Sequence, residues 1–485
     1  MSTPAKPVAT FGKRATRPSK IIAHLGVGGF SRAHQFYVLD QLSSGSSDWG
    51  VMGVGIKSWD AKMYETLKSQ NFLFTCNMRS ESVNEVVVVK SIVDYAPLFS
   101  DPKSFNKLLE DRVKIISLTV TEKGYCTTET GALDLSNLDI KSDIVNFNSS
   151  SFQPQTAVGL ICKVVEERRK IGVEMVTVMS CDNLPMNGET TRKAVLEFAK
   201  EVGGGLEEFI QENIPFPNSM VDRITPVTSK SHIEEISTRH GIEDAWPVVC
   251  EPFLQWVIED KFVNDNRPKW DEVSGVIFTD DVEGYEFMKL RLLNSTHSSM
   301  SYISTLVGFK LVFESMADKD VEVFVRRYMA EIVVTLEEVE GVDFGEYMNS
   351  LVERFANPEI KDSLDRLSLD GSQKFRNALA PALDQLKESK GEMKTVRVAL
   401  AAYLRYCAGV DMEGQKMECV DDPMKEGLEE IGGRMLEGGG KEVCEEFLTL
   451  VFGEELVGGW AEFVDGVFIA YGELVEKGAR AMLLK

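Results

Sequence analysis

The feature that most constrains the fold is a short apolar segment that ends in a glycine-rich turn. Ile21–Leu25 is followed by Gly26, Val27, Gly28 and Gly29, and the residues after the turn place apolar side chains at helical spacing. This order predicts a strand, a tight turn and a helix. Glycines there let the backbone approach a pyrophosphate, which then binds at the helix N-terminus. The pattern therefore predicts a dinucleotide site, with a purely structural turn as the alternative.

Residues near this turn are candidates for reading the dinucleotide. Arg32, just inside the helix, is expected to pair with a phosphate or to lie on the surface. Asp60 follows the second predicted strand and is the candidate ligand of the ribose hydroxyls, although it lies 32 residues beyond Gly28 instead of about 20. Lys57 and Ser58 precede it and would suit a 2′-phosphate. We therefore expect NAD as the cofactor and leave NADP open.

Further apolar segments alternate with helical ones along the first part of the chain. A helix is predicted at about 190–202, and three more strands are predicted at 51–56, 114–120 and 174–180. Strands separated by helices are typical of a parallel sheet that is covered on both faces. The polar loops follow the carboxyl ends of these strands, which is where ligands bind in such sheets.

Beyond Tyr285 the strand signals nearly vanish. Helical segments are predicted at 286–310, 318–340, 372–389, 393–408 and 441–480. We therefore predict an α/β fold, with a Rossmann-like, doubly wound N-terminal domain over 21–285 and a mostly α-helical C-terminal domain over 286–485. Residues 1–20 carry five basic side chains and no acidic one. We expect a flexible lead there, with an organellar targeting segment as the alternative.

The charge balance excludes several classes of partner. The chain has 485 residues and a formal net charge of −23, which opposes binding to nucleic acid and to anionic membranes. No apolar run approaches the ~18–20 residues of a transmembrane helix. The eight cysteines form no C-x-x-C pair and the five histidines form no ligand motif, so we expect reduced thiols, a cytoplasmic location and no metal. A small-molecule substrate and a monomer or weak homodimer are expected.

An amine, an amide and an imidazole occur close together in the segment 287–298. At ~100° per residue of an α-helix, Asn294 lies ~140° and His297 ~80° around from Lys289, so all three fit on one side. Lysine can accept a proton if burial lowers its pKa, asparagine can donate to an oxyanion, and histidine can do either. This combination indicates chemistry on a carbonyl or an alcohol. The alternative is an amphipathic helix with a solvated polar face.

Seven ordered motifs within about residues 21–381 carry a resemblance to a known family. They are His24–Gln35, Thr119–Tyr125, Cys181–Gly188, Phe216–Pro226, Gln255–Asp260, Lys289-x4-Asn294-x2-His297 and Arg366–Lys374. By these motifs the chain resembles the polyol-specific long-chain dehydrogenases, most of all their mannitol-oxidising members. The resemblance implies oxidation of a polyol at C2 to a ketose, with a nicotinamide cofactor and without metal. The expected pair is D-mannitol with NAD and D-fructose with NADH.

The resemblance also implies which residues carry the chemistry. Lys289 would be the general acid and base, and Glu286, one helical turn earlier, would relay protons to solvent. Asn183 and Asn294 would hold the reacting oxygen of the substrate.

Other residues would orient or bind the reactants by the same resemblance. Asp222 and His297 would orient the substrate or the lysine, and Arg366 and Lys374 would bind substrate hydroxyls from the helical domain. The expected cofactor-binding residues are Gly26, Gly28, Gly29, Phe30, Arg32, Asp60 and Glu122.

Three alternatives to a polyol dehydrogenase stay open from the sequence. A hexuronate reductase, acting on fructuronate or tagaturonate, needs a cation for the carboxylate, and Arg366 or Lys374 would supply it. A polyol-phosphate dehydrogenase would use the same cations for a phosphate. A non-catalytic dinucleotide-binding protein is the alternative from another class, but such a protein has no use for a proton acceptor at Lys289.

Overall fold

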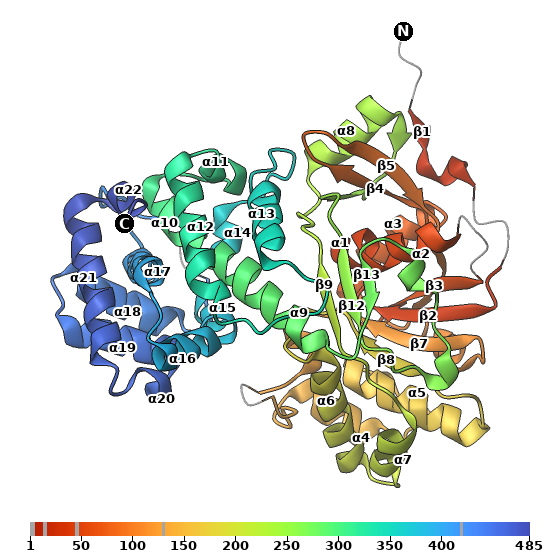
Figure 1. Cartoon of the computed structure of the whole chain (residues 1–485). Coiled ribbons are helices and arrows are strands. Elements are labelled where there is room, and N and C mark those ends of the chain that lie inside the picture. Colours follow the sequence, from red (N-terminus) through yellow and green to blue (C-terminus); the bar gives the residue numbers. More distant parts are fainter. Residues whose placement is uncertain (1–4, 13–16, 44–47, 129–130, 418–420) are drawn as a thin grey trace. The chain divides into compact units, whose positions relative to one another are not determined.

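The structure is a computed structural model that describes residues 5–12, 17–43, 48–128, 131–417 and 421–485. The chain divides into two units, residues 1–282 and residues 283–485, which are described separately (Figure 1). Lys13 and Arg14 of the basic lead, and the cysteine Cys419, lie outside the described residues.

The first unit is built on a five-stranded parallel sheet with the order β6-β3-β2-β7-β8. Its strands are β2 (Lys20–Leu25), β3 (Trp49–Gly55), β6 (Ile92–Pro97), β7 (Val113–Leu118) and β8 (Thr177–Ser180). The chain builds outward from β2 to β6, and then returns to the centre to add β7 and β8 on the other side. The strand order therefore reverses between β2 and β7, where open α/β sheets bind their ligands. This topology confirms the predicted Rossmann-like, doubly wound fold.

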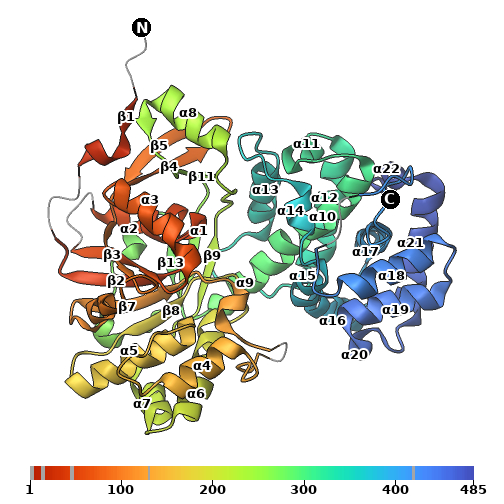
Figure 2. The same cartoon turned by 180° about the vertical axis from the view of Figure 1, so that it is seen from behind.

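Helices cover both faces of the sheet because its side chains are apolar on both sides. In β2, Ile21 and Ala23 join the core on one face, whereas Ile22 joins the core on the other. Four helices cover the first face: α4 (Leu138–Asn146), α5 (Ala157–Ile171), α6 (Asn187–Val202) and α7 (Leu206–Asn213) (Figure 2). Three helices cover the second: α1 (Gly29–Ala33), α2 (Gln35–Ser43) and α3 (Ala61–Ser69).

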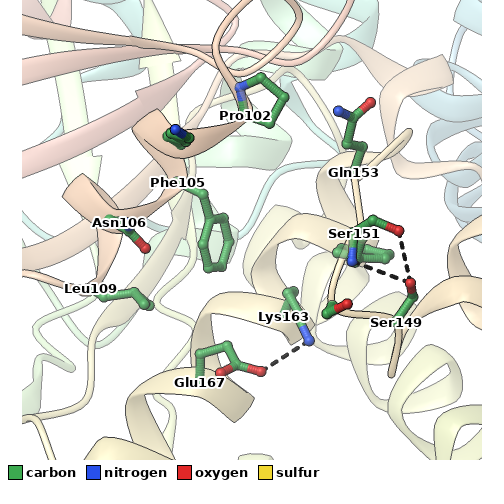
Figure 3. A pocket seen from close by; sticks show the side chains of 12 residues that line it. Pro102, Phe105, Asn106, Leu109, Ser149, Ser151, Gln153, Lys163 and Glu167 are labelled. Atoms are coloured by element: carbon green, nitrogen blue, oxygen red, sulfur yellow. Dashed lines mark hydrogen bonds and ion pairs between the residues drawn. The ribbon is translucent and has the colours of Figure 1, made fainter.

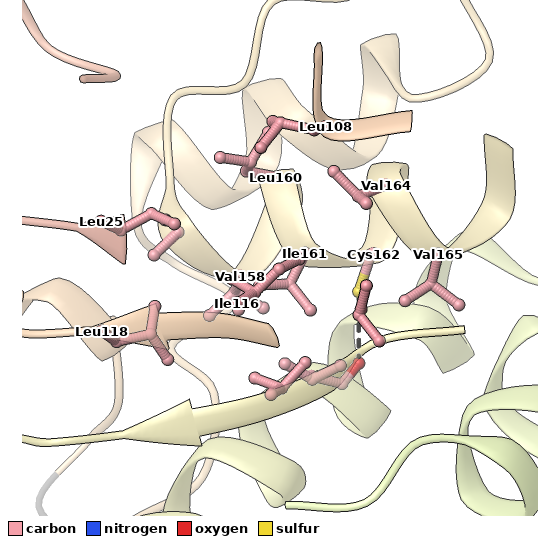
Figure 4. Packing of buried hydrophobic residues seen from close by; sticks show 14 of the residues in the cluster. Leu25, Leu108, Ile116, Leu118, Val158, Leu160, Ile161, Cys162, Val164 and Val165 are labelled. Atoms are coloured by element: carbon pink, nitrogen blue, oxygen red, sulfur yellow. Dashed lines mark hydrogen bonds between the residues drawn. The ribbon is translucent and has the colours of Figure 1, made fainter. Parts of the chain in front are cut away.

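Helix α5 shows how the sequence sets the ends and the buried face of one of these helices. The hydroxyl of Thr156 accepts a hydrogen bond from the Gly159 N–H at 2.9 Å and so caps the N-terminus. Gly172 ends the helix with a φ of 70°, a conformation that glycine adopts at little cost. Between the caps, Val158 packs near Ile116 of the sheet (Figure 4). Full burial of such a side chain stabilises the fold by about 1.5–3 kcal/mol.

Two three-stranded sheets accompany the main one, with the orders β11-β4-β5 and β13-β12-β9. Their strands are β4 (Phe74–Arg79), β5 (Asn84–Val89), β9 (Ser219–Asp222), β11 (Val248–Cys250), β12 (Gln255–Ile258) and β13 (Val276–Phe278). Most of these strands, and β6 of the main sheet, were not predicted. Several have only three or four residues, too few to show a period in the sequence.

The N-terminal lead is folded over residues 6–11, so the expectation of a flexible lead is wrong there. Strand β1 (Lys6–Pro7) pairs in parallel with β10 (Ile242–Glu243), which follows helix α8 (Lys230–His240). Val8 is fully buried in a small core with Leu73 and Ile236. The sequence signal for this folded segment was Val8, an apolar residue among the basic ones, which the count of charges did not take into account.

The second unit is mostly helical, as predicted. Its helices are α9 (Val282–Met288), η7 (Lys289–Asn294), α10 (Ser295–Val307), α11 (Val312–Met316), α12 (Lys319–Val333), α13 (Phe344–Phe355), α14 (Leu364–Ser368), α15 (Gly371–Ala378), α16 (Ala380–Ser389), α17 (Lys394–Tyr406), α18 (Lys425–Leu436), α19 (Lys441–Phe452), α20 (Glu454–Val457), α21 (Ala461–Lys477) and α22 (Ala479–Met482). Helices α10 and α17 contact each other and are buried along most of their length. In the described parts of the chain, every helix is too short or too polar to cross a membrane.

Candidate active site

The turn after β2 has a shape that only glycine fits. Gly26 has a φ of +85°, and a Cβ at this position would lie 2.1 Å from the carbonyl oxygen of Thr119, at the end of β7. The Thr119 hydroxyl donates to the Gly26 carbonyl at 2.8 Å and lies 2.9 Å from His24 Nε2. Since the hydroxyl has one proton, His24 donates the second bond. Burial lowers the pKa of His24 to about 3, so this histidine is a neutral brace for the turn.

The next two glycines, Gly28 and Gly29, have open space where a side chain would begin. A Cβ at Gly29 would meet nothing within 4 Å, and one at Gly28 would meet only the Gly26 carbonyl oxygen at 3.7 Å. Side chains at these positions would fill the space in front of α1. The arrangement fits the predicted pyrophosphate of a dinucleotide, which needs close approach to the backbone. Phe30 stacks on His34 at 5.1 Å beside this space.

Arg32 does not have the predicted role. Its side chain is fully buried, Nε donates to the Gly28 carbonyl at 3.0 Å, and Nη1 donates to the Trp246 carbonyl. The guanidinium therefore braces the glycine turn from inside the protein and does not face a phosphate. The sequence suggested a phosphate ligand because Arg32 lies in the first turn of the helix, but the side chain points into the core.

Asp60 lies five residues beyond the end of β3, and its carboxylate binds the backbone between them. One carboxylate oxygen accepts hydrogen bonds from the Ile56 and Lys57 N–H groups at 2.9 and 3.0 Å. The Lys57 ammonium is 2.6 Å from Asp139. The local cation is therefore already paired, whereas the carboxylate of Asp60 stays partly exposed. This arrangement suits ribose hydroxyls better than a 2′-phosphate.

The loops that follow β7 and β8 are tied together by one carboxylate. Asp182 accepts hydrogen bonds from the Val120 N–H and the Thr121 N–H, both at 2.9 Å, and from the Tyr125 hydroxyl at 2.7 Å. Thr121 has a φ of 63° and a ψ of 167°, a conformation that non-glycine residues rarely adopt. The clamp presents Glu122 and Asn183, the neighbours of Thr121 and Asp182, at the exposed carboxyl edge of the sheet.

Asp222 ends β9 and is buried, beside Gln255 of β12. Arg223 next to it donates to the backbone carbonyls of Glu251 and Ala33 at 3.0 and 2.6 Å. Arg223 therefore ties α1 to the small sheets.

In the second unit, the predicted helix at 286–310 contains a π-helical segment, η7 (Lys289–Asn294), between α9 and α10. Its hydrogen bonds join residues five apart, which is how far Asn294 stands from Lys289. The angle of ~140° expected from α-helical geometry is therefore wrong. The wide turn brings Lys289 and Asn294 onto the same side of the helix. Lys289 is 5% exposed and Glu286 is 7% exposed, so both are held inside the protein.

His297 is buried on α10, and its ring centroid lies 4.1 Å from that of Phe355. Burial holds the pKa of His297 well below its usual range, and the positive charges of Arg366, Arg354 and Lys374 lower it further. The imidazole is therefore neutral at pH 7 and can donate or accept a hydrogen bond. These three side chains are therefore the cations whose charges act on the imidazole.

Helix α10 is not the solvated amphipathic helix that the sequence left open. Its residues from Ser295 to Leu306 are all buried, including its serines and threonines. Small polar side chains at the centre of the unit let neighbouring helices approach closely, and this explains a core helix that is poor in large apolar residues.

Arg366 and Lys374 stand on α14 and α15, joined by a sharp turn. Asp370 has a φ of 53°, and a Cβ at Gly371 would lie 1.9 Å from the Tyr302 hydroxyl oxygen. Lys374 donates to the Leu367 carbonyl at 2.9 Å. Burial and the charge of Arg366 lower the pKa of Lys374 to about 8. The charges of both cations also lower the pKa of His297.

Other features of the described residues are structural. The seven described cysteines are free thiols, and the described residues contain no group of three or more histidine, cysteine or acidic side chains arranged for a metal ion. A hollow of about 490 Å³ lies between η3 (Pro102–Leu109) and α5 (Figure 3). Its Lys163 already bonds the Phe147 carbonyl and Glu167, each at 2.9 Å.

Comparison with known proteins decides the family. The model of the mannitol dehydrogenase Rossmann domain matches residues 20–272, and that of the mannitol dehydrogenase C-terminal domain matches residues 281–453. A mannitol 2-dehydrogenase from Pyricularia oryzae is 39% identical over 473 residues, which cover 96% of this chain and 92% of that protein. The chain belongs to the mannitol dehydrogenase family.

Two other members of the mannitol dehydrogenase family are informative. The structure of mannitol 2-dehydrogenase from Pseudomonas fluorescens, a ternary complex with NAD and D-mannitol, is 38% identical with a TM-score of 0.85, covering 99% of this chain and 95% of that one. D-mannonate oxidoreductase from Escherichia coli is 35% identical and covers 98% of this chain and 97% of that protein. The family thus includes enzymes named for a neutral polyol and for a sugar acid.

Reasoning from the sequence missed several residues that act on the candidate site residues of the second unit. Phe355, which contacts His297, and Arg354, whose charge acts on it, belong to α13, which was not predicted. Asp362 pairs with Arg366 and stands four residues before it. The spacing i,i+4 of an acid and an arginine was a visible signal for this pair.

Proposed function

We propose that this member of the mannitol dehydrogenase family interconverts D-mannitol and D-fructose. The chain is a polyol dehydrogenase and its cofactor is NAD, since it has the family's two domains and the open glycine turn of a dinucleotide site. The observation that carries the choice of residues is the π-helical segment. Buried Lys289 and Asn294 stand on one wide turn, and His297, whose imidazole is neutral, follows Asn294 by three residues on α10.

These residues provide what alcohol oxidation requires. When bound, NAD accepts the hydride from C2 of the polyol. Lys289, as a neutral amine, takes the proton of the hydroxyl, and Glu286, one helical turn before it, carries that proton to solvent. Asn294 donates to the developing alkoxide, and Asn183 is proposed as a second amide donor. Oxyanion donors of this kind contribute roughly 2.7–4 kcal/mol each.

A hexuronate reductase is the second candidate. The charges of Arg366, Arg354 and Lys374 act on His297, and a sugar acid needs a cation for its carboxylate. The similarity to D-mannonate oxidoreductase favours the same idea. Against it, Arg366 is already paired with Asp362, so its charge is compensated before an anion binds. A phosphorylated polyol would need still more positive charge.

A comparison of substrates tests the proposed function. The enzyme is assayed with D-fructose, D-fructuronate and D-fructose 6-phosphate, each with NADH and with NADPH, by the absorbance of the reduced nicotinamide. We expect the highest kcat/KM for D-fructose with NADH. If either anionic substrate exceeds D-fructose by about tenfold, the mannitol assignment is wrong while the dehydrogenase assignment stands. A preference for NADPH would show that Lys57 and Ser58, not Asp60, decide the cofactor.

A further inference from the structure

The guanidinium of Arg366 is held by a carboxylate from its own segment. Arg366 Nε donates to Asp362 Oδ1 at 2.6 Å, and Nη2 donates to Asp362 Oδ2, so the two groups meet as two parallel bonds. The Asp362 side chain is 6% exposed, whereas that of Arg366 is 47% exposed. The pair is therefore not an ordinary surface ion pair, because its acidic half is fixed inside the protein. Asp362 raises the pKa of Arg366, which stays charged.

The backbone around Asp362 is fixed without its carboxylate. The Val312 N–H donates to the Asp362 carbonyl at 3.0 Å, and the Asp362 N–H donates to the Ile360 carbonyl at 2.9 Å. Ser363 caps α14, since its hydroxyl accepts from the Arg366 N–H at 3.2 Å. The side chain of Asp362 is thus left for one task, which is to bind Arg366.

This task changes the charge that a substrate meets. Arg354, Arg366 and Lys374 all act on the buried His297, and Asp362 and Asp370 act on Lys374 with the opposite sign. Without Asp362, the group of cations would suit a sugar carboxylate or a phosphate. With Asp362, an anionic substrate would share one guanidinium with a second carboxylate, and the two like charges would repel each other.

We propose that Asp362 is a specificity-determining positioning residue. It holds Arg366 in place and compensates its positive charge with a negative one. Arg366 then donates to the hydroxyl groups of a neutral polyol or ketose, and binding of an anionic sugar is disfavoured. The proposal rests on the proposed function, in which Arg366 binds substrate hydroxyls. Beyond that function, it assigns to Asp362 the preference for neutral over acidic substrates.

The test is the ratio of kcat/KM for D-fructuronate to kcat/KM for D-fructose, measured with NADH. We expect Asp362→Asn to raise this ratio at least about tenfold, mainly through a lower KM for the acid. Asp362→Glu keeps the charge and should keep the wild-type ratio. Glu322→Gln is the matched control, because Glu322 forms an i,i+4 pair with Arg326 at 2.8 Å on α12 and both side chains of this pair are partly exposed. This control should leave kcat/KM unchanged for both substrates.

The outcomes separate the proposal from a merely structural role. Loss of a structural residue lowers activity on both sugars and leaves their ratio unchanged, so a folded Asp362→Asn variant with a ratio within threefold of wild type overturns the proposal. If Asp362→Asn is poorly folded by its melting temperature, Asp362→Ser carries the same expectation. The wild-type ratio alone tests the proposed function. A wild type that prefers D-fructuronate refutes the mannitol assignment, whatever the variants do.

Discussion

At the scale of single residues, burial decides what each titratable group can do. His24 and His297 are both neutral because burial lowers their pKa values, yet His24 bonds two hydroxyls, whereas the charges of three cations act on His297. The sequence shows His24 in an apolar segment and His297 between serines and threonines. It does not show these partners, because the fold brings them near each ring from distant parts of the chain.

Lys374 should make substrate binding depend on pH. Its pKa is lowered to about 8, so the ammonium donor is complete below that pH and is lost above it. We expect the KM for D-fructose to be constant below about pH 8 and to rise at higher pH in the wild type. In Lys374→Arg the side chain stays charged, so this rise should disappear. Steady-state kinetics at saturating NADH over pH 6–10 check it, and an unchanged rise in the variant would show that another group titrates.

At the scale of elements, the sequence predicted a helix over 286–310 but not the π-helical segment inside it. A π-helical segment adds a wide turn without breaking the helix, and apolar periodicity over a few residues does not reveal it. The consequence is chemical, because the segment sets the side on which Asn294 stands relative to Lys289. The glycine turn after β2 was recognised correctly, because its glycines, the strand before it and the helix after it all lie in one short segment of the sequence. Arg32 was misread because its partners are distant.

The turn after β2 gives a prediction at the same scale. Gly26→Ala combines an unfavourable φ with a Cβ 2.1 Å from the Thr119 carbonyl oxygen, so the turn must shift. We expect a loss of about 1–3 kcal/mol of stability and at least about tenfold weaker NAD binding. Gly172→Ala is the control, because Gly172 also has a positive φ, +70°, but open space around it. It should lose stability and keep NAD affinity; equal NAD affinities in the two variants would contradict the account.

At the scale of the whole molecule, four of the five strands of the main sheet and the change to helices near residue 283 follow from patterns that are local in sequence. The strands of the small sheets do not, because several are three or four residues long and are stabilised by distant partners. The predicted helix at 441–480 is interrupted at Gly453, which ends α19 with a φ of +89°. The candidate site residues could be named because their motifs are ordered. Arg354 was missed because it is distant in sequence from His297, on which its charge acts, whereas Asp362 was missed although it stands four residues before Arg366.

The most direct test of the account is the turnover of Lys289→Ala, measured together with its affinity for NAD by fluorescence titration. Lys289 is proposed as the group that accepts the proton, and general acid–base catalysis contributes about 10²–10⁴-fold. We therefore predict that kcat for D-mannitol oxidation falls by this factor while the Kd for NAD stays near that of the wild type. A variant with kcat within threefold of wild type would contradict the assignment of Lys289.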